Sequence, residues 1–164
     1  FNKNYKTFAK SLAKTKSYYK ETISLKSFEI KEFSFLYVLL TKPKLIHENF
    51  HLIDQVKLYS DENKQLYKEV LNQSENLLNL DIKNLNVDKN LIKRVINYAS
   101  VKHIIKKNLN DDEKILEIFT EIIQDLKSYE LEQRISDLES KFSNDMSEST
   151  FNEIKELKKQ QKIN

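Results

Sequence analysis

The chain of 164 residues contains no glycine. Glycine gives the backbone access to positive φ and allows it to approach a phosphate closely, so its absence excludes phosphate loops, dinucleotide-binding fingerprints and most tight hairpin turns. Cysteine is also absent, which excludes disulfides and thiolate metal sites. With 39% hydrophobic and 32% charged residues, the composition is typical of a helical protein with a modest core. We therefore predict an all-α fold.

The densest apolar segment spans residues 33–40, of which all but Ser34 are hydrophobic. Such a run predicts a buried central helix. Pro43, the single proline, ends this helix and begins a short one over residues 43–50. Further helices are expected to begin at the N-caps Ser60 and Asp88. The residues expected to be buried in this part of the chain include Phe33, Leu36, Leu40, Leu45, Ile46, Phe50, Leu71 and Val95.

After the polar stretch 108–112, no helix-breaking residue occurs before Asn144, which predicts one long helix capped by Asp111 or Asp112. Its apolar face is broad from Ile115 to Leu126, as a bundle helix requires. Beyond that point the apolar residues follow the 4, 3, 4 spacing of a narrow two-helix seam. The seam residues are Leu131, Ile135, Leu138 and Phe142.

A turn over residues 143–146 and an N-cap at Ser147 predict a last helix that folds back on the long one. The chain is thus expected to have three parts. They are a basic amphipathic helical arm (1–28), a helical bundle (29–110), and a long helix with a C-terminal antiparallel helical hairpin (111–164).

Charge changes along these parts. The arm carries seven lysines against one glutamate, the bundle segment has a net charge of +3, and residues 111–164 have a net charge of −6. Since cations that displace counterions supply affinity for nucleic acid, we expect little or no direct nucleic-acid binding outside the arm. The arm itself has two interpretations, a helix that packs its aromatic stripe on a neighbour or a membrane-surface segment.

Residues 47–51 read His-Glu-Asn-Phe-His and match the H-E-x-x-H pattern of zinc proteases. Glu69 could supply a third ligand. Such enzymes also need a sheet edge and a cleft, and the sequence predicts no strand. We therefore interpret His47 and His51 as residues on the outer face of the short helix, and expect no catalytic residue, no metal ligand and no cofactor.

Two groups of segments show a family resemblance through their order. The first is Leu39-Leu40-Thr41-Lys42-Pro43-Lys44-Leu45-Ile46, followed by Leu66-Tyr67-Lys68-Glu69-Val70-Leu71. The second comprises residues 135–142, 145–149 and 151–158. Over residues 29–162, the chain resembles the C-terminal helicase-binding domain of bacterial DnaG-type DNA primases. One departure is Lys42, which stands where the family usually has histidine before the proline.

The resemblance implies a non-catalytic domain that binds the N-terminal domains of the hexameric replicative helicase and recruits primase to the replication fork in the cytoplasm. It implies no membrane contact and a monomer in isolation. Two rival interpretations are the N-terminal domain of the helicase itself and a zinc-dependent peptidase. The expected partner contacts are Met146, Phe151, Ile154, Leu157, Lys158 and Gln161.

Because a hairpin with one narrow seam has little core of its own, its remaining apolar groups gain most from packing on a partner. Phe151, Ile154 and Leu157 have an equally supported second interpretation. A helix with one apolar stripe must bury that stripe first, so these residues could form the seam itself.

Overall fold

The computed structural model describes residues 25–163, apart from residues 55, 74–79 and 81. The described residues form helices and their connections, which confirms the predicted all-α class. Residues 1–24 of the predicted arm lie outside the described residues, and Ser27 already belongs to the first described helix. The elements are α2 (Ser27–Thr41), α3 (Pro43–Glu48), the 3-10 turn η1 (Phe50–Leu52), α4 (Asp61–Asn72), the 3-10 turn η3 (Ile82–Asn84), α5 (Lys89–Tyr98), α6 (Lys102–Lys107), α7 (Asp112–Asp145) and α8 (Glu148–Ile163).

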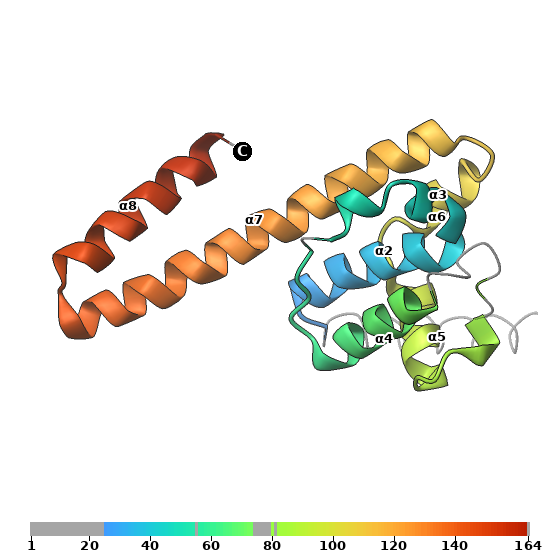
Figure 1. Ribbon diagram of the computed structural model, residues 1–164, viewed down its shortest axis with the longest axis horizontal. Coiled ribbons are helices and arrows are strands. Elements are labelled where there is room, and N and C mark those ends of the chain that lie inside the picture. Colours follow the sequence, from blue (N-terminus) through green and yellow to red (C-terminus); the bar gives the residue numbers. More distant parts are fainter. Residues whose placement is uncertain (1–24, 55, 74–79, 81, 164) are drawn as a thin grey trace, which may run out of the picture.

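Helix α2 is the central element of the bundle (Figure 1). Its residues 32–40 are all buried, because α3, α4, α5, α6 and α7 contact it. This confirms the buried helix predicted from the apolar run. Of the predicted core residues, Phe33, Leu36, Leu40, Leu45 and Val95 are buried, and Leu71 is half-buried against the core.

Aspartate side chains begin two of the helices at the predicted positions. Asp88 accepts a hydrogen bond from the Asn90 N–H at 2.8 Å, and Asp111 accepts one from the Lys114 N–H at 2.9 Å. Both bonds satisfy an N–H group that the first turn of a helix leaves without a partner. Ser60 precedes α4 as predicted, but its hydroxyl makes no capping hydrogen bond.

A buried carboxylate from α2 holds the start of α4 instead. Glu32 accepts hydrogen bonds from the Tyr59 N–H, the Ser60 N–H (3.3 Å) and the side-chain amide of Asn63 (2.6 Å). Burial raises the pKa of Glu32, although its hydrogen bonds with Asn63, Tyr59 and Ser60 oppose this change. The loop before α4 is thereby fixed to the central helix.

The short helix after Pro43 ends earlier than predicted. Helix α3 stops at Glu48, and Phe50 is 41% exposed, so its predicted inward position is wrong. One cause is local: the side-chain amide of Asn49 donates to the Leu45 carbonyl at 2.9 Å, and such bonds compete with the helical backbone ladder. The side chain of Ile46, also expected inside, lies outside the described part of the structure.

Helix α7 belongs to both parts of the molecule (Figure 1). From Ile115 to Leu126 its apolar side chains join the core around α2, and the ring of Phe119 stacks on Phe35 with centroids 5.4 Å apart. The core thus crosses the boundary predicted at residue 110. Packing places that boundary near residue 129, so residues 27–128 are called the bundle and residues 129–163 the hairpin.

Candidate protein-interaction surface

The hairpin is held together by a narrow apolar seam. Among the described residues 129–163, Ile135, Ile154 and Leu157 are the buried ones. They lie where α8 packs against the second half of α7. Leu131, Leu138 and Phe142, the other predicted seam residues, are half-buried. The seam therefore matches the spacing in the sequence.

Two ion pairs cross the seam. Arg134 meets Glu153 at 2.6 Å, and Lys158 meets Glu139 at 2.5 Å. All four side chains are well exposed, and exposed ion pairs contribute only about 0–1 kcal/mol each. The hairpin consequently depends on its three buried aliphatic residues.

The tip of the hairpin exposes a methionine in an unfavourable backbone conformation. Met146 ends α7 in the left-handed region (φ 43°), with its N–H donating to the Phe142 carbonyl at 2.8 Å. Glycine usually occupies such a position, because other residues pay about 1–2 kcal/mol there. This glycine-free chain places methionine there, and 77% of its surface is exposed. Ser147 then accepts a hydrogen bond from the Thr150 N–H at 3.3 Å and begins α8.

The six predicted contact residues fall into two groups. Ile154 and Leu157 are buried in the seam, so they shape the hairpin and do not face a partner. Phe151 lies 5.9 Å from the Phe142 ring, between centroids, but leaves 52% of its surface exposed. The exposed residues of the predicted set are Met146, Phe151, Lys158 and Gln161.

A groove of about 330 Å³ runs along α8 beside the seam. Sequence analysis identified three of its lining residues but missed Lys155 and Lys159. Their spacing from Phe151, four and eight residues, is the signal that places them on the same helical face. The groove is lined by Phe151, Ile154, Lys155, Lys158 and Lys159.

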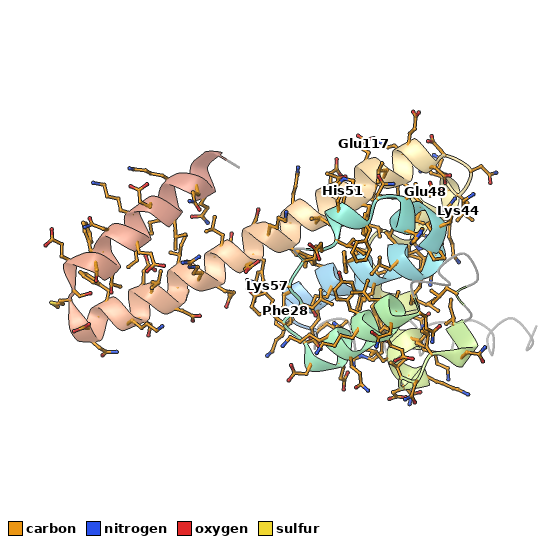
Figure 2. The ribbon with its side chains drawn as sticks, viewed as in Figure 1. Phe28, Lys44, Glu48, His51, Lys57 and Glu117 are labelled. Atoms are coloured by element: carbon orange, nitrogen blue, oxygen red, sulfur yellow. The ribbon has the colours of Figure 1, made fainter. Side chains whose placement is uncertain are left out.

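The junction between bundle and hairpin carries an aromatic cluster that the sequence did not indicate. The rings of Phe28, Tyr59 and Tyr129 lie within 6.0 Å of one another, between centroids. Beside them, Lys57 meets Glu130 at 2.7 Å. Figure 2 shows Phe28 and Lys57 at the edge of the bundle from which α7 projects. We call these five residues the neck.

The histidine pattern does not form a metal site in the described residues. His47 lies on α3 and His51 in the following 3-10 turn, so they do not share one continuous helix, and both are exposed. Figure 2 shows Glu48 and His51 away from the neck, near the start of α7. In the described part of the chain, no three His, Asp or Glu side chains are placed to hold a metal ion.

The bundle has a larger groove of its own, about 580 Å³, between α4 and the loop that precedes it. Its lining combines apolar side chains, among them Leu58 and Tyr67, with Lys57, Lys64 and Lys68. The Tyr67 hydroxyl donates to the Ile53 carbonyl at 2.9 Å, and burial raises the pKa of Tyr67 to about 12. This groove is the main competing surface for a partner.

Among the described helices, none has both the length and the apolar character needed to cross a bilayer. Comparison with protein-family models, curated proteins and solved structures finds no match for this chain. No relative therefore indicates its function, which has to be inferred from the sequence resemblance and the geometry of the hairpin.

Proposed function

We propose that this chain is a non-catalytic interaction domain of a bacterial DNA primase. Its hairpin binds the N-terminal domains of the hexameric replicative helicase and so brings primase to the replication fork, in the cytoplasm. The observation that carries this proposal is a projecting hairpin with almost no core that exposes Met146 and Phe151. The segment order around Pro43 and residues 135–158, which resembles the primase family, supplies the identity of the partner.

The physical support comes from the distribution of apolar side chains. The bundle core ends at Leu126, so it does not need the hairpin for its own packing. Large apolar side chains exposed on an element with little core are stabilised by covering them with a partner, as in helix-in-groove recognition. Met146 and Phe151 are such residues, and both lie at the turn end of the hairpin.

The test is a calorimetric titration of the N-terminal domain of the cognate replicative helicase with two forms of the chain. One is the complete chain and the other ends at Met146, which removes α8. We expect the complete chain to bind and the shortened one to bind at least about 100-fold more weakly, since a few central anchors dominate most interfaces.

A circular-dichroism melt of the shortened chain is the control, because the bundle should unfold as in the complete chain. Equal affinities of the two forms would move recognition to the bundle, where the groove beside α4 is the candidate surface. Rings or dimers in analytical ultracentrifugation would favour the helicase N-terminal domain as the identity of the chain.

A further inference from the structure

The groove on α8 is basic although the C-terminal third of the chain is acidic. Residues 111–164 carry a net charge of −6. In contrast, the described lining of the groove contains three lysines and no acidic residue. Phe151, Lys155 and Lys158 are spaced i, i+4 and i+7, so they share one face of the helix. The composition of the segment therefore conceals the charge of this face.

The three lysines differ in how far their charge is already used. Lys158 is paired with Glu139 at 2.5 Å, and Lys159 with Glu156 at 2.6 Å. The hydrogen bond from Lys159 lowers the pKa of Glu156. Lys155 has no ion pair with any residue that the structure describes. A carboxylate from a partner can therefore approach Lys155 without displacing an existing one.

The apolar part of the groove lies at one end. Phe151 exposes 52% of its surface there, while Ile154 is buried and forms part of the floor. From Phe151 to Lys159 the groove extends over about two helical turns, or ~12 Å. A ligand that matches it needs an apolar side chain at one end and a carboxylate one turn away, on the same face.

We infer that this groove receives an acidic amphipathic α-helix of the partner protein, whose apolar residue covers Phe151 and whose carboxylate pairs with Lys155. The inference rests on the proposed function, under which this helix belongs to the helicase N-terminal domain. A helix is the occupant because i, i+4 spacing on the partner reproduces the separation of Phe151 and Lys155. Charge complementarity selects its acidic character.

The test compares two charge reversals, Lys155→Glu in the groove and Lys141→Glu outside it. Lys141 is exposed on α7 and does not line the groove. The ligand is the N-terminal domain of the cognate helicase, titrated by calorimetry at several salt concentrations. We expect Lys155→Glu to weaken binding about tenfold and to flatten its salt dependence, while Lys141→Glu changes affinity less than about threefold.

A third variant, Lys155→Met, removes the charge but keeps an unbranched side chain that favours helix, so it guards against disruption of α8. It should bind with intermediate affinity. If the unmodified chain binds but Lys155→Glu matches Lys141→Glu, the inference is overturned and the proposed function stands. Absence of binding by the unmodified chain overturns both.

Discussion

The two halves of α7 differ in what they bury, although they form one continuous helix. The half in the bundle, residues 112–128, buries six large apolar side chains, whereas the half in the hairpin, residues 129–145, buries only Ile135 among its described residues. The difference follows from apolar spacing, a broad face in the first half and a narrow seam in the second. A single helix can therefore be a core element at one end and a support for an interaction surface at the other.

The largest expected effect comes from truncating a leucine in each region. Leu40→Ala should cost about 2–5 kcal/mol, since Leu40 is buried on the central helix. Leu138→Ala, in the half-buried seam, should cost about 1 kcal/mol. Urea unfolding followed by circular dichroism measures both. Equal losses, or a loss below about 0.5 kcal/mol for Leu40→Ala, would remove the distinction between bundle and hairpin.

Glu32→Ala should be the next largest change, about 2–4 kcal/mol, because it leaves the Tyr59 and Ser60 N–H groups and the Asn63 amide without their acceptor. Ser60→Ala is the matched control. Its hydroxyl makes no capping hydrogen bond, so its loss should cost under about 0.5 kcal/mol. The same urea experiment decides whether the buried carboxylate or the serine holds α4, and a costlier Ser60→Ala would favour the serine.

The raised pKa of Glu32 also predicts a pH dependence with a defined sign. Because the folded chain binds this proton more tightly than the unfolded chain, the stabilisation is present below the unfolded value of 4.5 and is lost as pH rises through the folded value. Relative to Glu32→Gln, the unmodified protein should therefore gain stability as pH falls from 7 toward 4.5. A constant difference between the two proteins over this range would contradict the shift.

The neck should control how firmly the hairpin is held to the bundle. Tyr59→Ala removes a ring that lies 5.3 Å from Tyr129 and 6.0 Å from Phe28, between centroids, at a cost of about 1 kcal/mol. Distances between one spin label on α4 and one on α8 should become more broadly distributed. Tyr59→Phe keeps the ring and should preserve the narrow distribution. Unchanged distributions in both variants would show that the continuous helix alone sets the direction.

The smallest expected effect is at the tip. Met146→Gly removes the left-handed strain, but it also gives the unfolded chain more freedom, so we expect a net gain of about 0.5 kcal/mol in hairpin stability. Slower amide exchange in α8 would report this gain. Affinity for the helicase domain should fall at the same time, because Met146 is one of the proposed contacts. A loss of hairpin stability would show that the Met146 side chain packs productively.

Features encoded by neighbouring residues could be predicted from the sequence. The buried run of α2, the N-caps Asp88 and Asp111, and the seam around Ile135 all depend on residues within a few turns of one another. Periodicity and capping are local signals, and they remain local in the fold. The same locality explains why the predicted seam spacing matches the hairpin.

Features that join distant segments could not be predicted in this way. Glu32 meets the Ser60 N–H from 28 positions away, and Phe28 meets Tyr129 across the whole bundle. At the candidate site, periodicity placed Phe151, Ile154 and Leu157 on one face but did not decide which of them α7 covers. The packing of α8 on α7 makes that choice, burying the two aliphatic residues and leaving Phe151 beside the lysines.

Hydrogen exchange measured by mass spectrometry, with and without the helicase N-terminal domain, tests most directly the assignment of stability to the bundle and recognition to the hairpin. In the free chain, amides of α2 should exchange slowest and those of α8 much faster. Addition of the helicase domain should slow exchange in α8 and in residues 129–145, and leave α2 unchanged. Slowed exchange around the groove beside α4, with α8 unaffected, would contradict the assignment.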